Sequence, residues 1–344
     1  MSALVLGANG FIGRWLVLEL LTQGRPVAAA TRPGRAAALT DWLSAHGAPA
    51  DGLTTVTADI TRPDLGLSPA DDERLADVRD VYNLAALYRF GLTRPEARAA
   101  NHDGALHVAR WAAGRPGVRR LVHLSGYRVG DRPVPLPPAE AERLYRTLGA
   151  YEASKSEGDS ALRALAPQLG LPLSVVSPSA VIGHSVTGEA GQYLGLATMV
   201  DQLHQGRLPA LPGSRRTFVP VVAVDHLARF LAATPEHDRD PLARHTVLDP
   251  ATPELPGLIH LLATHLGVRP PRLRVPVGLV RRLPQSLTGA DPETLSFLSE
   301  DRYDTASAER LARAAGLDQA PVADVLRRWA DRLVAEDFGR RPAA

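Results

Sequence analysis

The first thirty residues carry the feature that most constrains the fold. A short apolar run at residues 3–6 leads directly into the glycine-rich segment GANGFIG at residues 7–13. An apolar helical pattern then continues to about Gly24, and a second apolar run occupies residues 26–31. Apolar runs this short are typical of strands buried on both faces of a parallel sheet. The order strand, glycine turn, helix and strand predicts an α/β protein with a doubly wound parallel sheet.

Glycines at three-residue spacing in such a turn suit the binding of a dinucleotide. They permit a tight turn, let the backbone approach a pyrophosphate and let the helix pack close to the strand. The phosphates then meet the N–H groups and the positive end of the helix dipole. A tight turn without a ligand is the alternative, and the flanking strands and helix disfavour it. We therefore expect a Rossmann-type cofactor site that includes Gly7, Asn9, Gly10, Phe11, Ile12 and Gly13.

A tyrosine and the only lysine of the chain form a second pattern. Lys155 follows Tyr151 by four residues, so the two share one face of a helix. Arginine does not replace lysine where a compact ammonium is needed. Carbonyl reduction needs a proton donor, and an adjacent ammonium lowers a tyrosine pKa from about 10. The pattern predicts that Tyr151 donates this proton, although a lysine kept by chance on a solvated helix is the alternative.

The glycine spacing and the Tyr-x-x-x-Lys pattern together resemble the short-chain dehydrogenase/reductase superfamily. The GxxGFIG form of the glycine motif and the chain length are similar to those of its extended branch. That branch includes sugar-nucleotide epimerases and dehydratases as well as reductases like dihydroflavonol reductase. The resemblance is firm over residues 3 to about 235 and loose beyond them. It implies an NAD(P)-dependent oxidoreductase, and the dihydroflavonol-reductase-like group is the better match.

The resemblance also implies roles for individual residues. It makes Ser125, at the end of an apolar run, the hydroxyl that assists the substrate carbonyl, and Asn101 a helix residue that supports the active site. Tyr88, which follows Ala86 as in the dihydroflavonol-reductase-like group, is expected to face the substrate. Tyr127 and Tyr193 are also expected to do so, as aromatic side chains near the expected pocket. The cofactor contacts that it implies beyond the glycine turn are Asp59, Ile60, Leu84, Ala85, Ala86, Tyr151, Lys155, Pro178 and Val181.

The end of the second apolar run bears on the choice of cofactor. An NAD site usually has an acidic residue about 20 residues beyond the glycines, where it binds the ribose 2′-hydroxyl. The chain has no acidic residue between Glu19 and Asp41, and Arg32 stands near that position. A guanidinium suits a 2′-phosphate. These features favour NADP(H) over NAD(H), while an ordinary loop arginine is the alternative.

The domain organisation follows from the same patterns. We expect an NADP-binding Rossmann domain at residues 1–183, with a returning segment at about 217–248. Residues 184–216 and 249–344 are expected to form a smaller, mixed C-terminal lobe that binds substrate, with residues 337–339 in a C-terminal tail. The side chains near the expected pocket are mostly apolar or aromatic, and besides the three tyrosines they are Phe90, Val186, Leu194, Leu196 and Met199.

Three functions compete on this evidence. The first is an NADPH-dependent reductase of a ketone or aldehyde on a small hydrophobic substrate, aromatic or polyketide-like, in secondary metabolism. The second is a sugar-nucleotide epimerase or dehydratase with tightly bound NAD(P), in which Arg215 or Arg216 would hold a diphosphate. The third is a cofactor-sensing regulatory protein, which would normally lack the tyrosine–lysine pair. The missing acidic residue favours the reductase.

Composition excludes several other classes. A hydrophobic fraction of 45% over 344 residues indicates a buried core. Without cysteine there is no disulfide or thiolate metal site, and the histidines show no ligand spacing, so no metal is expected. A net charge of +2 without an arginine–aromatic run argues against nucleic acid binding. No apolar stretch has bilayer-spanning length and no signal peptide is seen, so we expect a cytoplasmic protein, compatible with a homodimer, whose partner is a small-molecule substrate.

Overall fold

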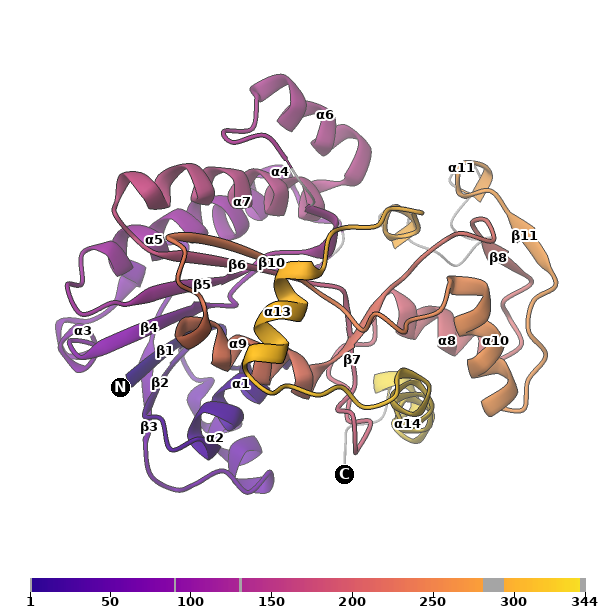
Figure 1. Ribbon diagram of the computed structural model, residues 1–344, viewed down its shortest axis with the longest axis horizontal. Coiled ribbons are helices and arrows are strands. Elements are labelled where there is room, and N and C mark those ends of the chain that lie inside the picture. Colours follow the sequence, from indigo (N-terminus) through magenta and orange to yellow (C-terminus); the bar gives the residue numbers. More distant parts are fainter. Residues whose placement is uncertain (1, 90, 130–131, 281–293, 341–344) are drawn as a thin grey trace. The chain divides into compact units, whose positions relative to one another are not determined.

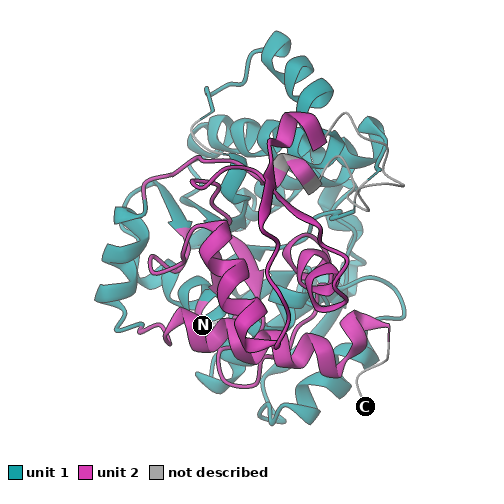
Figure 2. Cartoon of the chain, turned by 90° about the vertical axis from the view of Figure 1, so that its right-hand side faces the viewer, with its two compact units in different colours: residues 1–177, 227–246, 305–317 teal, residues 178–226, 247–304, 318–344 magenta. Residues whose placement is uncertain are grey.

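The computed structural model describes residues 2–89, 91–129, 132–280 and 294–340. Its internal contacts divide the chain into two compact units (Figure 2). Unit 1 comprises residues 1–177, 227–246 and 305–317, and unit 2 comprises residues 178–226, 247–304 and 318–344.

Unit 1 is built on a seven-stranded sheet. The pairings from β3 to β6 are all parallel, with Leu4 of β1 opposite Ala28 on one side and Val81 on the other. The predicted α/β class with a Rossmann-type parallel sheet is therefore confirmed. From one edge to the other the strands are β10 (Leu242–Val247), β6 (Leu173–Pro178), β5 (Arg120–Leu124), β4 (Val78–Asn83), β1 (Ser2–Leu6), β2 (Val27–Thr31) and β3 (Leu53–Thr57).

The order of the strands places the functional edge of the sheet. The chain builds outward from β1 to β3, then returns to continue from β4 on the other side of β1. Ligands of such sheets bind beyond the carboxyl ends of the strands at this reversal. Residues 3–5 of β1 are fully buried and β2 is buried along its length, which explains why both runs are apolar or small.

Helices cover both faces of this sheet. Figure 1 shows α5 (Gly104–Ala113) and α7 (Ala150–Gln168) on one side, and α1 (Phe11–Thr22) and α2 (Ala36–Ala45) on the other. Leu4, Val81 and Leu121 of the sheet share one buried cluster with Trp111 of α5 and Leu162 of α7. The remaining helices associated with unit 1 are η1 (Pro63–Gly66), α3 (Pro69–Arg74), α4 (Arg94–Arg98), the π-helical turn η2 (Ala99–Asp103), η3 (Tyr127–Val129), α6 (Pro138–Leu148), α9 (Val224–His237) and α13 (Ala306–Ala314).

Unit 2 is a smaller lobe of short strands and helices. Leu258, Leu326 and Trp329 lie in its core. Residues 337–339, expected in a C-terminal tail, instead form a 3-10 turn whose Phe338 is buried in this core and whose Gly339 packs against the ring of Tyr193. The elements of this lobe are β7 (Ala180–Ile182) paired with β9 (Val221–Ala223), β8 (Ala210–Pro212) paired with β11 (Leu273–Val275), α8 (Leu196–His204), α10 (Leu255–His265), α11 (Val277–Val280), η4 (Thr294–Phe297), α14 (Val322–Ala335) and η5 (Asp337–Gly339).

Candidate active site

The glycine turn brings three backbone segments into close approach. A Cβ atom at Gly7 would lie 2.8 Å from the backbone of Ala85, and one at Gly13 would overlap the Gly7 carbonyl oxygen. Gly7 also has a φ of +82°, which side chains other than glycine rarely adopt. Phe11, which is buried, and Ile12 follow in the first turn of α1, whose N-terminus has no side-chain cap. The geometry fits a cofactor pyrophosphate held by these N–H groups.

The loop after β2 is tied to the glycine turn. The Asn9 side-chain amide donates a hydrogen bond of 2.8 Å to the Arg35 carbonyl. Arg32 directly follows β2, is exposed, and forms no ion pair within the part of the chain that the structure describes. At the end of the neighbouring strand, Asp59 accepts hydrogen bonds from the Thr61 backbone and hydroxyl. These bonds, with a smaller contribution from Arg32, lower the pKa of Asp59. An exposed cation and an ionised carboxylate therefore follow the ends of two neighbouring strands, β2 and β3.

The carboxyl ends of β4 and β5 are joined by buried polar groups. Asn83, at the end of β4, lies 3.2 Å from the ring nitrogen Nδ1 of His123 on β5, and its Oδ1 accepts the Ala85 N–H. Burial and the nearby Lys155 ammonium lower the pKa of His123 well below its usual range, so its ring is neutral. Leu84 and Ala85 are half-buried beside the glycine turn, whereas Ala86 is exposed.

Ser125 and Lys155 meet at the end of β5. The Lys155 ammonium donates a hydrogen bond of 2.7 Å to the Leu124 carbonyl, and both Lys155 and Ser125 are buried. Burial lowers the pKa of Lys155 to about 8, although Asp159 acts in the opposite direction. The Ser125 hydroxyl donates to Asp159, at 3.1 Å. The structure thus brings these two predicted residues to the same strand end, on the edge where β4 carries Asn83.

Tyr151 lies in the first turn of α7 and packs against another predicted residue. Its ring meets Tyr88 edge to face, with centroids 4.7 Å apart and planes at 62°. Burial raises the pKa of Tyr151, and Tyr88 and Glu152 act in the same direction. The predicted lowering of this pKa by Lys155 is therefore not found, because the ammonium is directed to the Leu124 carbonyl. The phenol keeps its proton at neutral pH, which suits a proton donor.

Asn101 acts on the backbone beside Tyr88. Its Oδ1 accepts the Leu87 N–H at 2.8 Å, and its Nδ2 donates to the Leu87 carbonyl and to the Ser154 hydroxyl. Asn101 is buried on the π-helical turn η2, a distortion that often marks functional sites. The contact fixes the segment that presents Tyr88 to Tyr151 and ties it to α7.

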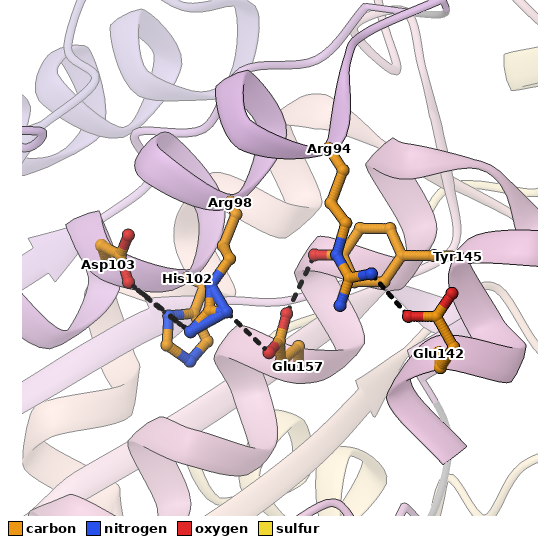
Figure 3. A network of polar contacts seen from close by, with 7 residues as sticks. All are labelled: Arg94, Arg98, His102, Asp103, Glu142, Tyr145 and Glu157. Atoms are coloured by element: carbon orange, nitrogen blue, oxygen red, sulfur yellow. Dashed lines mark hydrogen bonds and ion pairs between the residues drawn. The ribbon is translucent and has the colours of Figure 1, made fainter. Parts of the chain in front are cut away.

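A polar network on the same helices was not predicted from the sequence (Figure 3). Glu157 of α7 accepts hydrogen bonds from the Tyr145 hydroxyl at 2.9 Å and from Arg98 at 3.0 Å. Arg94 pairs with Glu142 at 2.6 Å and lies over the Tyr145 ring. Because these residues come from α4, α6 and α7, the network fixes the helix that carries Tyr151 and Lys155 to its two neighbours.

The other predicted site residues lie on several elements of both units. Tyr127 follows Ser125 in η3 and is half-buried, whereas Ile60 packs on Gly104. Pro178 ends β6, and Val181 lies in β7. The Tyr193 hydroxyl donates to Glu336 at 2.7 Å, so this tyrosine is engaged within unit 2. Of the other expected pocket residues, Leu196 and Met199 pack in the core of unit 2, Val186 and Leu194 are exposed, and Phe90 lies outside the described residues.

The fold and the family comparison define the class of protein. A Rossmann-type sheet with a glycine turn at its reversal point is the framework of a nicotinamide-dependent oxidoreductase. Residues 5–231 match an NAD-binding family described as male sterility protein. The chain belongs to this family, and it is an NAD(P)-dependent oxidoreductase of the extended short-chain dehydrogenase/reductase type, as the sequence predicted. No helix among the residues that the structure describes is long and apolar enough to cross a bilayer.

The chain is also similar to individual reductases and to biosynthetic proteins of known structure or sequence. The chain is 28% identical over 252 residues to the non-canonical nonribosomal peptide synthetase FrzA of Cladobotryum sp, an alignment covering 67% of this chain and 24% of FrzA. It is 27% identical over 195 residues to dihydroflavonol 4-reductase of Zea mays, covering 53% of each. The terminal R domain from the myxalamid PKS-NRPS biosynthetic pathway has the same fold, with a TM-score of 0.77, 19% identity and coverage of 99% of this chain and 92% of that chain. The chain matches about a quarter or less of its first curated relatives.

Proposed function

We propose that the chain is an NADPH-dependent reductase of a ketone or aldehyde on a small hydrophobic substrate. The observation that carries the proposal is the meeting of Ser125, Lys155 and the Asn83–His123 pair at the carboxyl ends of β4 and β5, next to the glycine turn. Tyr151 begins the helix that carries Lys155. A bound reduced nicotinamide would supply the hydride there.

The residues of the chain supply the proton and hold the carbonyl. Tyr151, with its proton retained at neutral pH, donates it to the carbonyl oxygen as that oxygen gains charge. The Ser125 hydroxyl rotates from Asp159 to donate to the same oxygen. The Lys155 ammonium, which donates to the Leu124 carbonyl before the reaction, turns toward the phenolate that the proton transfer leaves and stabilises its charge. Asn101 keeps the Leu87–Tyr88 segment in place against Tyr151.

A hydrophobic substrate is supported by the surroundings of Tyr151. Tyr88 packs on it, and burial raises the pKa of Tyr88 as well, so both rings are largely withdrawn from water. Tyr88 and Tyr127 are the substrate contacts that we propose in unit 1, while Pro178 and Val181 remain proposed cofactor contacts. Tyr193 is left out because its hydroxyl is bound to Glu336. The likeness to a nonribosomal peptide synthetase and to dihydroflavonol 4-reductase supports a role in secondary metabolism.

The sugar-nucleotide alternative finds less support. Its diphosphate would need Arg215 or Arg216, and both side chains are exposed on a turn. The Arg216 guanidinium already pairs with Glu300, at 3.4 Å, within unit 2. The two functions differ in whether the cofactor is consumed, and a labelled cofactor distinguishes them.

Replacement of Arg32 by alanine tests the choice of cofactor. We expect wild-type protein to bind NADPH more tightly than NADH. The variant should lose about ten- to hundredfold in NADPH affinity and little in NADH affinity, because a charge-assisted contact to the 2′-phosphate contributes about 1.5–3 kcal/mol. Calorimetric titration of both cofactors measures this. Arg110→Ala, an exposed arginine on α5, is the matched control and should change neither affinity. Equal wild-type affinities for the two cofactors would refute NADPH selectivity.

A further inference from the structure

A buried carboxylate, Asp159, accepts the Ser125 hydroxyl before the reaction and has no further role in the steps above. Asp159 lies one helical turn after Lys155 on α7 and is 1% exposed. One of its oxygens accepts the Ser125 hydroxyl at 3.1 Å, and the other accepts the Nε–H of Arg163 at 2.7 Å. A buried charge is costly unless it is paired and hydrogen-bonded. Both oxygens of the Asp159 carboxylate accept hydrogen bonds, and one of the two donors is Ser125 of the proposed site.

Arg163 anchors the carboxylate from the side away from Ser125. It is itself buried, and its Nη2 donates to the Arg132 carbonyl at 3.2 Å. Ser160, next along α7, donates to the Pro133 carbonyl at 2.7 Å. The backbone of residues 132–133 is thereby held on this turn of α7. The ion pair with Arg163 therefore fixes one carboxylate oxygen of Asp159 and restricts the orientation of the other oxygen, which accepts the Ser125 hydroxyl.

We propose that Asp159 is a positioning residue of the reductase site, which holds the Ser125 side chain at the end of β5 until substrate binds and keeps the side chain of Lys155 charged. This inference rests on the roles of Ser125 and Lys155 in the proposed function. Residues four apart share a helix face, so the carboxylate and the ammonium lie on the same side of α7. Ser125 has a single hydroxyl hydrogen, and its bond to Asp159 holds the oxygen at the end of β5 until a carbonyl oxygen competes for that hydrogen.

The electrostatic part of the proposal has a definite sign. Burial favours the neutral amine of Lys155, and the carboxylate of Asp159 opposes it. His123 on β5 also interacts with Lys155, but its ring is neutral, so it does not replace the carboxylate. Arg163 partly neutralises Asp159 from the same helix. Removing the charge of Asp159 should lower the pKa of Lys155, and removing the charge of Arg163 should raise it.

The single lysine makes a direct measurement possible. Protein labelled with lysine carrying ¹³C at the ε carbon, expressed without lysine in any tag, gives one lysine signal, and its shift against pH reports the pKa of Lys155. We expect a wild-type pKa of about 8. Asp159→Asn should lower it by about one unit or more. Asp159→Glu should restore most of the wild-type value. Asp80→Asn is the matched control, since this carboxylate is equally buried and paired with Arg25 and Arg119, and it should leave the Lys155 signal unchanged.

The two charge variants separate positioning from general disruption. If Asp159→Asn does not fold, Arg163→Gln carries the test, because its expected shift is upward. Its control is Ser160→Ala, which removes a bond from the same turn of α7 to the Pro133 carbonyl without changing a charge and should leave the pKa of Lys155 unchanged, whereas loosened packing would raise that pKa in both variants. An unchanged Lys155 pKa in folded Asp159→Asn, or no rise in Arg163→Gln, would overturn the inference. The titration needs neither substrate nor turnover. Its failure is therefore distinct from failure of the proposed reductase function, which the cofactor and turnover measurements test.

Discussion

Replacement of Tyr151 by phenylalanine is expected to lower kcat by about 10²- to 10⁴-fold, the usual contribution of a general acid. The variant loses only the hydroxyl, and its ring can keep the edge-to-face contact with Tyr88. NADPH affinity should therefore stay close to that of the wild type. Turnover is measured by following NADPH oxidation with a panel of aromatic and aliphatic aldehydes and ketones, and affinity is measured by calorimetry.

The matched control for this variant is Tyr82→Phe. Tyr82 is fully buried on β4, and its hydroxyl makes a long hydrogen bond of 3.4 Å to the Ala232 carbonyl, away from the strand ends. Its loss should leave kcat unchanged. Turnover of Tyr151→Phe within a few-fold of wild type would exclude Tyr151 as the proton donor. If Tyr82→Phe lost turnover to the same extent, the effect of Tyr151→Phe would be explained by reduced stability of the protein.

Replacement of Lys155 by arginine should lower kcat by at least about 10²-fold, although the charge is retained. Lys155 is 5% exposed, and its ammonium is directed to the Leu124 carbonyl. A planar guanidinium is larger and cannot take the place of a compact ammonium in that space. Turnover at neutral pH, together with thermal unfolding, measures the effect. The control is Arg110→Lys, which replaces an exposed arginine of α5 by lysine and should leave both turnover and thermal unfolding unchanged. Wild-type turnover in Lys155→Arg would show that the lysine has no special chemical role.

The features that were predictable from the sequence are local in the chain. The glycine turn, the strand before it and the helix after it lie within residues 3–24, and their pattern defines the unit from which the parallel sheet is built. Tyr151 and Lys155 are one helical turn apart, so their spacing was also visible. A doubly wound sheet reverses its strand order beside the first strand, and the structure has this reversal.

The features that were missed depend on contacts between distant residues. Glu157 binds Arg98, which is 59 positions away, and Asn101, although predicted as a supporting residue, binds the backbone of Leu87, which is 14 positions away and was not foreseen as its partner. The environment of Tyr151 was missed for the same reason, because the burial that raises its pKa comes from neighbours such as Tyr88. Asp159 is the exception, since its position four residues after Lys155 was a signal that the sequence contained.

Transfer of a deuteride from NADPH that carries deuterium at both positions of the nicotinamide C4 tests the central claim most directly. A reductase should place one deuterium on the carbonyl carbon of the alcohol product for each NADPH oxidised, so that cofactor consumption and product formation are equal. Mass spectrometry of the product and absorbance of the cofactor measure the two quantities in one reaction. The proposed function predicts this one-to-one transfer in the wild type, and a rate of transfer about 10²- to 10⁴-fold lower in Tyr151→Phe. Conversion of a sugar nucleotide without net oxidation of the cofactor, and with no deuterium transferred to any aldehyde or ketone, would contradict it.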